Sequence, residues 1–221
     1  RRHCFAPWRL VRHERKSGIA MEFEKYELTK KAVVRAEIDC AINLFFQGSP
    51  ENKAAVAANV LAWAAVDVLR GIADKNGTKT VRSIIEDKIK PDYVAYWRTL
   101  ERESYTFSKH ADRDSNGVVN FRPEAVAFAL FYAVMDYGTV YMKCTMPMHI
   151  YRSWFTTRYS GILQISGEDR ERALQSLFAM DAASDFWSSV QSGRVVCELW
   201  KEHAGEMRSM LPDTLLRQLE Q

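Results

Sequence analysis

The sequence predicts an all-α fold, a single irregular helical domain of about seven to nine helices. Apolar residues recur every three or four positions, as at Val34, Ile38 and Phe45, and this spacing is typical of a helix with one buried face. Proline and glycine divide such segments where helices are expected to begin and end. No segment shows the sustained alternation of apolar and polar residues that predicts a strand.

The helices expected from this pattern cover residues 28–47, 50–75, 79–89, 92–103, 123–144, 149–159, 167–180 and 185–210. Gly48, Ser49 and Pro50 fit the end of one helix, the N-cap of the next and its first residue. The alanine-rich second helix and the apolar run Ala125–Met135 are the expected core. That run is too short to span a bilayer, which needs about twenty residues, so we predict no membrane span.

The positive charge of the chain is concentrated at its beginning. The formal net charge is +3, but residues 1–20 contain six Arg or Lys and one Glu. The rest is slightly acidic, so we do not expect residues 21–221 to bind nucleic acid. We expect Met21 to be the native start, with residues 1–20 a basic tail outside the domain. A genuine basic arm for nucleic acid or an anionic surface is the alternative.

Cysteine spacing and the lack of a secretory pattern indicate a reducing compartment. The four cysteines are far apart and form no CxxC pair, which excludes a zinc framework or a disulfide scaffold. Cys40 and Cys144 are expected to pack as small apolar residues. We predict a cytoplasmic protein. The sequence names no cofactor and no specific partner, and it is compatible with a protein partner or a homo-oligomer.

Polar chemistry concentrates in the segment Tyr105–Glu124, which lacks helical periodicity. Its centre, Lys109–Asp114, contains a lysine, a histidine, two aspartates and an arginine within six residues. The simplest interpretation is a connection between helices, because Asp, Asn and Gly favour turns. In that case Asp112 or Asp114 would cap backbone N–H groups, and Lys109 and Arg113 would bind helix carbonyls or carboxylates.

A second interpretation is a calcium-binding loop at Asp112–Glu124. In the EF-hand pattern Asp112, Asp114 and Asn116 would occupy the first three ligand positions, followed by the glycine of the sharp turn. The closing bidentate glutamate is missing, because Pro123 stands at its position and Glu124 comes one residue later. The pattern is therefore incomplete, and the chain has no second loop to pair with it.

A third interpretation is catalysis by His110, because a histidine beside acids and bases can transfer protons near neutral pH. All-helical ribonucleases of the HEPN type carry an arginine, four to six further residues, and then a histidine. Arg102 and His110 have seven residues between them, so the spacing exceeds that motif by one. A HEPN-like ribonuclease is therefore the alternative function from a different class.

The run Phe107–Asp114 resembles the FFKHADRD signature of a family of small bacterial helical proteins without an established activity. The resemblance extends more loosely to AINLFFQGSP and VLAWAAVDVLRGIA, about two thirds of the chain. The family typically has Asn and a second Phe where this chain has Thr106 and Ser108. The resemblance implies that KHADRD is one unit and that Met21 begins the matching region, and it assigns no catalytic residue.

Asp67 and Arg70 stand one turn apart on the second helix, either as an exposed ion pair or facing the polar segment. Together these observations favour a helical protein that binds a partner or small ligand through Lys109–Asp114. The expected binding residues are Lys109, Asp112, Arg113, Asp114, Asp67 and Arg70, with His110 as the catalytic candidate and Asp112, Asp114 and Asn116 as metal candidates.

Overall fold

The computed structural model describes residues 27–51, 53–87, 91–109, 116–159 and 185–210. These residues form helices and no strand, which confirms the predicted all-α class. The helices are α1 (Lys30–Phe46), α2 (Ala54–Lys75), α3 (Val81–Glu86), α4 (Pro91–Lys109), α5 (Pro123–Tyr141), α6 (Met146–Arg158) and α8 (Phe186–Met210).

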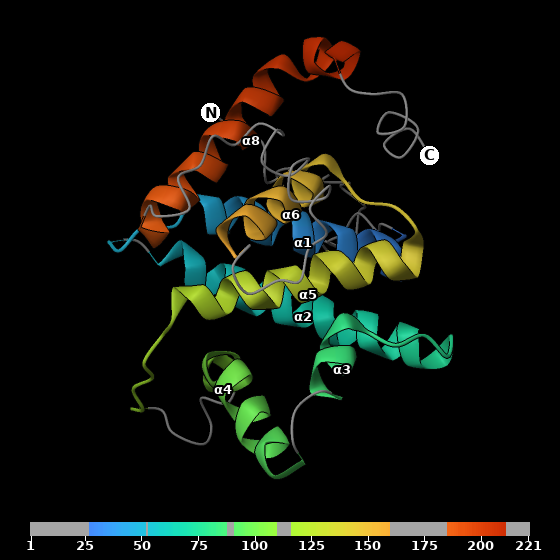
Figure 1. Ribbon diagram of the computed structural model, residues 1–221, viewed down its shortest axis with the longest axis vertical. Coiled ribbons are helices and arrows are strands. Elements are labelled where there is room, and N and C mark those ends of the chain that lie inside the picture. The colour runs from blue at the N-terminus through green and yellow to red at the C-terminus, as the bar shows by residue number, and fades with distance from the viewer. Residues whose placement is uncertain (1–26, 52, 88–90, 110–115, 160–184, 211–221) are drawn as a thin grey trace, which may run out of the picture.

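The centre of the fold is α2, which packs against α1 and α5 (Figure 1). Ala58, Ala62 and Ala65 are fully buried, and their small side chains let the neighbouring helices approach closely. In Figure 1 α6 and α8 lie on one side of these central helices, and α3 and α4 lie on the other. The two helices predicted to form the core, α2 and α5, therefore do so.

Helix α2 begins later than the sequence predicts, at Ala54 instead of Pro50. The Ser49 hydroxyl accepts a hydrogen bond from the Glu51 N–H at 3.3 Å, so Ser49 forms a local turn there. Lys53 occupies the N-cap position without a side-chain bond. Among the described helices, α2 is the one long and apolar enough to cross a membrane, a property that buried core helices share.

Helix α4 is longer than predicted and continues through Tyr105 to Lys109. Tyr105 is buried and stacks on Trp63 of α2 with ring centroids 6.1 Å apart, so a tertiary contact holds a turn whose sequence is polar. The N-terminal half of α4 carries aromatic rings that are not buried. Tyr93 and Tyr96 are 60% and 64% exposed, and Trp97 is half-buried.

Aromatic rings fill the space between α1, α6 and α8, and we call this set the aromatic cluster: Phe45, Phe46, Tyr151, Trp154 and Phe186. Each polar atom of its buried rings is bonded. The Tyr151 hydroxyl donates to the Ala127 carbonyl at 2.5 Å, and the Trp154 Nε1–H donates to the Ser189 carbonyl at 2.7 Å. A Cβ added to Gly193 would lie 2.1 Å from Phe46, so α8 packs directly on this ring.

One further expectation is wrong, because Cys40 is exposed instead of packed inside. It lies off the buried stripe of α1, which runs through Ile38, Ala41 and Ile42. The expected helix at 167–180 and the N-terminal tail at 1–20 lie outside the described residues.

Candidate functional site

A cavity of about 400 Å³ lies where α4 meets α2, α3, α5 and α6, and we call it the aromatic pocket. Its wall is mostly apolar and aromatic. The lining residues are Trp63, Ile85, Trp97, Glu101, Arg122, Ala125, Phe128, Ala129, Phe131, Tyr132 and Phe155. Ligand sites in proteins are typically concave, mostly apolar and roughly 300–1,000 Å³ in volume, so the pocket has the dimensions of a small-molecule site.

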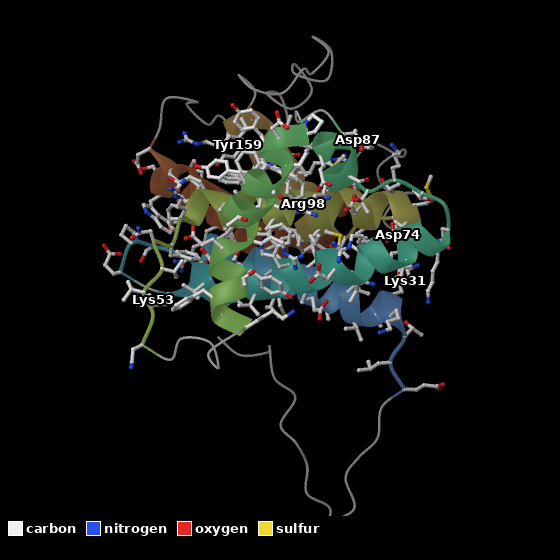
Figure 2. All side chains as sticks on the ribbon, turned by 90° about the horizontal axis from the view of Figure 1, so that it is seen from below. Lys31, Lys53, Asp74, Asp87, Arg98 and Tyr159 are labelled. Atoms are coloured by element: carbon white, nitrogen blue, oxygen red, sulfur yellow. The ribbon has the colours of Figure 1, made fainter. Side chains whose placement is uncertain are left out.

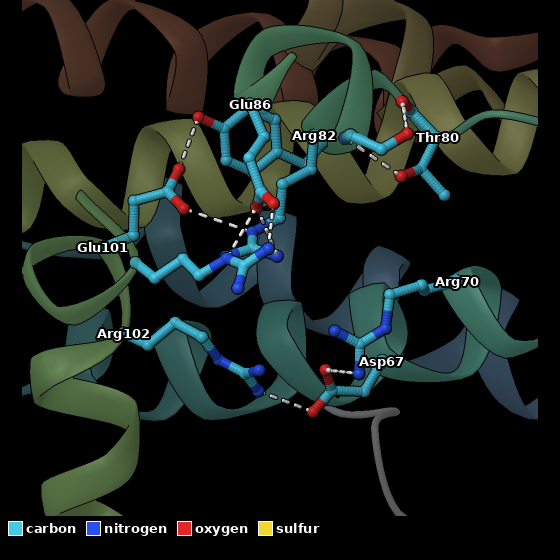
Figure 3. A network of polar contacts seen from close by, with 10 residues as sticks. Asp67, Arg70, Thr80, Arg82, Glu86, Glu101 and Arg102 are labelled. Atoms are coloured by element: carbon cyan, nitrogen blue, oxygen red, sulfur yellow. Dashed lines mark hydrogen bonds and ion pairs between the residues drawn. The ribbon is translucent and has the colours of Figure 1, made fainter. Parts of the chain in front are cut away.

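An ionic network adjoins the pocket at Glu101 and Tyr132, which line it (Figure 3). The Arg82 Nε–H donates to Glu101 at 3.1 Å, and the Tyr132 hydroxyl donates to the other oxygen of Glu101 at 2.7 Å. Glu86 lies 3.8 Å from Arg82 and also binds Arg98 of α4. Figure 2 shows α4 crossing the central helices with Arg98 on it. The network therefore ties α3, α4 and α5 together at the pocket.

The Arg82 guanidinium packs on two of the rings that line the pocket. Its guanidinium lies 5.7 Å from the ring centre of Trp63 and 5.1 Å from that of Trp97. Cations within about 6 Å of an aromatic face are attracted by the ring quadrupole. Two aromatic faces that could hold a ligand cation are therefore already occupied by a side chain of the protein.

Burial raises the pKa of Glu101, while the Tyr132 hydrogen bond and the Arg82 charge lower it. The pKa of Tyr132 is raised by burial and by the neighbouring Glu101 carboxylate. Both Glu101 oxygens accept hydrogen bonds from protein groups. Glu101 is therefore positioned as a fixed partner of Arg82 and Tyr132, which leaves little of its acceptor capacity for a ligand.

Two donors at the pocket have no acceptor among the described residues. The Nε1–H of Trp63 has no hydrogen-bond partner there, although this residue is only 1% exposed. Arg122 is the residue before Pro123, at the N-cap of α5, and its side chain is exposed and caps nothing. Water can satisfy the exposed Arg122, whereas an unsatisfied buried donor such as the Trp63 Nε1–H is uncommon in folded proteins and calls for a physical explanation.

The predicted pair Asp67 and Arg70 belongs to a second polar group beside the pocket. The Asp67 carboxylate lies 3.5 Å from Arg70 and accepts a hydrogen bond from Arg102 of α4 at 2.7 Å (Figure 3). The Tyr105 hydroxyl lies 3.4 Å from Asp67 and accepts a hydrogen bond from Lys109 at 3.0 Å. The structure thus brings Asp67, Arg70 and Lys109 together around α4.

The remaining predicted site residues lie mostly outside the described part of the chain. His110, Asp112, Arg113 and Asp114 are not described, and of the calcium candidates only Asn116 is. The nuclease and calcium hypotheses therefore stay predictions. Within the described residues, no group of three or more His, Cys, Asp or Glu side chains is placed to hold a metal ion.

Sequence reasoning missed the residues that form the pocket. Trp63, Ile85, Glu101 and Tyr132 come from four different helices, and none of them stands in a motif. The available signal was the spacing of Trp97 and Glu101, which puts a ring and a carboxylate on the same side of α4.

Comparison of the chain with protein-family models, curated proteins and solved structures finds no match. The resemblance of Phe107–Asp114 to a bacterial family signature therefore stays a prediction. Its first three residues end α4, and the others lie outside the described residues.

Proposed function

We propose that the protein binds a small apolar ligand in the aromatic pocket. The observation that supports this most is a cavity of about 400 Å³ whose wall is formed mainly by aromatic and other apolar side chains. An apolar cavity leaves its wall without dispersion contacts, so an empty one costs stability. A ligand of matching shape would restore those contacts.

The Lys109–Asp114 segment remains part of this proposal. Lys109 contacts Tyr105, and Tyr105 stacks on Trp63, which lines the pocket. Lys109, the first residue of the segment, is therefore linked to the wall of the pocket through Tyr105. This chain of contacts supports a role for the segment at the edge of the ligand site, as a neighbour of the pocket.

A reducing compartment such as the cytoplasm is also proposed. Cys144 and Cys197 are free thiols, as expected where disulfides do not persist. Burial raises the pKa of Cys197 to about 11 and also raises that of Cys144, so neither is an activated thiolate.

Titration with the uncharged fluorophore N-phenyl-1-naphthylamine tests the pocket. We expect saturable binding at one site per chain, and we expect Ala125→Trp to abolish it, because the indole would fill the space beside half-buried Ala125. Ala125→Leu is the milder variant and should weaken binding without abolishing it. Thr139→Trp is the matched control, because Thr139 lies exposed on the same helix outside the pocket.

Thermal unfolding monitored by circular dichroism shows whether each variant is folded. Binding that is equally strong in wild type, Ala125→Trp and Ala125→Leu would contradict the proposal. So would the absence of saturable binding to the wild-type protein.

A further inference from the structure

The polar groups of the aromatic pocket differ in whether they can still form a hydrogen bond with a ligand. The two oxygens of Glu101 each accept a hydrogen bond, from Arg82 and from Tyr132. The Trp63 Nε1–H has no acceptor within the described residues, but this atom is itself buried and does not open onto the cavity. The donor that the pocket still offers is the exposed guanidinium of Arg122, which lines it. The remaining capacity is therefore on the donor side, which fits a ligand that supplies an acceptor.

The charges of the lining also favour a ligand that carries a hydrogen-bond acceptor, and in particular an anion. The Glu101 carboxylate is balanced by Arg82 at 3.1 Å, so the uncompensated charge of the lining is the guanidinium of Arg122. Arg122 is followed directly by the first turn of the 19-residue helix α5. The unpaired N–H groups of a first helical turn favour an anion, although exposed Glu124 in that turn reduces the effect.

A cationic ligand fits the same wall poorly. The faces of Trp63 and Trp97 are already contacted by the Arg82 guanidinium, at 5.7 and 5.1 Å from the ring centres. A second cation placed there would be repelled by Arg82 and would compete with it for Glu101. The arrangement therefore disfavours ammonium compounds despite its many aromatic rings.

We propose that the ligand is a small aromatic or aliphatic acid, with its apolar body between the rings and its anionic group on Arg122. This inference rests on the proposed function, because it requires that the pocket binds a ligand. Arginine suits the role, since its planar guanidinium can donate two parallel hydrogen bonds to one carboxylate or sulfonate. The stacked rings Phe131 and Phe155, with centroids 4.2 Å apart, lie in the apolar part of the wall.

Two fluorophores that differ in one sulfonate test this proposal. N-phenyl-1-naphthylamine is neutral, and 8-anilinonaphthalene-1-sulfonate adds the anion to the same rings. We expect the wild-type protein to bind the sulfonate about five- to tenfold more tightly, the effect of one charge-assisted bond at a partly exposed arginine. The preference should decrease as salt is added, because the Arg122 side chain is exposed to solvent.

Arg122→Met should reduce the ratio of the two affinities to about one. Arg194→Met is the matched control, because Arg194 is an exposed arginine on α8 and should leave the ratio unchanged. A ratio that stays high in Arg122→Met, or that falls equally in Arg194→Met, would overturn the assignment of the acid.

The failure of this inference is distinguishable from that of the pocket itself. In one outcome, Ala125→Trp abolishes binding of both dyes while Arg122→Met keeps the preference for the sulfonate dye. That result would support the pocket as the binding site and contradict an acidic ligand on Arg122. If neither dye responds to Ala125→Trp, both proposals fail. The double variant Tyr93→Ser with Tyr96→Ser tests whether the dyes bind to the exposed rings of α4 instead. If this variant loses the preference for the sulfonate dye, the inference is also overturned.

Discussion

The aromatic cluster and the aromatic pocket contain the same residue types, but they differ in how the tryptophan Nε1–H is bonded and in the space beside the rings. In the aromatic cluster, Phe45 and Trp154 are 1% or less exposed, and the Trp154 Nε1–H is bonded to the Ser189 carbonyl. In the aromatic pocket, Trp63 is equally buried, yet its Nε1–H is unbonded among the described residues and a cavity of about 400 Å³ adjoins it.

The difference follows from what else the rings contact. The cluster is closed by apolar neighbours from α1, α6 and α8, and Gly193 lets α8 approach Phe46 directly. At the pocket, the charged side chains of Arg82, Glu101 and Arg102 intervene between α2 and α4. These charged groups link the helices through ion pairs and hydrogen bonds instead of through close ring packing, because a charge near the core must keep its bonded partners. The space for a ligand therefore lies beside the ionic network.

The largest contrast is expected from truncation of one ring in each region. Phe45→Ala should lower the free energy of unfolding by about 4 kcal/mol, because Phe45 is 1% exposed and contacts four other rings. Phe131→Ala should cost about 1–2 kcal/mol, since Phe131 is half-buried and already borders a cavity. Urea unfolding at equilibrium measures both, and equal costs would contradict the comparison.

A second contrast compares the ion pair beside the pocket with an exposed ion pair on α8. Arg82→Met should destabilise by about 3 kcal/mol, because it leaves the buried Glu101 carboxylate without its cation. Glu101→Met in the same chain should recover part of that loss, and a double-mutant cycle by urea unfolding measures the coupling. Arg194→Met on α8 is the control. Its exposed pair with Glu198 should contribute less than about 1 kcal/mol.

A coupling between Arg82 and Glu101 as small as that between Arg194 and Glu198 would show that the network does not hold α3 and α4 in place.

The sequence predicted the apolar core helices better than it predicted the polar end of α4. Helices α2 and α5 were found from alanine content and from the run Ala125–Met135, because burial within one helix leaves a periodic pattern. The end of α4 was missed, because Tyr105 to Lys109 are held by a ring contact to Trp63 that no local pattern records.

The predicted site and the aromatic pocket are different sets of residues. Composition drew attention to Lys109–Asp114, whereas the pocket is assembled from side chains that lie up to 92 positions apart, from Trp63 to Phe155. Each of these residues has an ordinary local role, as a core ring or a helix-surface charge. Their proximity is set by helix packing, which a single sequence does not encode in its spacing.

The smallest expected effect is a pH dependence on the pocket side of the fold. Asp136 of α5 is 1% exposed and accepts a hydrogen bond from the Val81 N–H at 2.6 Å, which holds the start of α3. Burial raises the pKa of its carboxyl to about 6, and the Val81 bond opposes the rise. The folded protein therefore binds this proton more tightly than the unfolded chain does, so stability should decrease as pH rises from about 4 to about 6.

Asp136→Asn removes the charge and keeps an oxygen that can accept from Val81. At pH 7 the variant should be more stable than wild type by about 2 kcal/mol, and the difference should vanish below about pH 4. Thermal unfolding across this pH range measures it, with Glu198→Gln on α8 as a control, since that exposed carboxylate should give no such trend. A variant that is less stable at every pH would show that the ionised carboxylate, through Val81, stabilises α3 more than its burial costs.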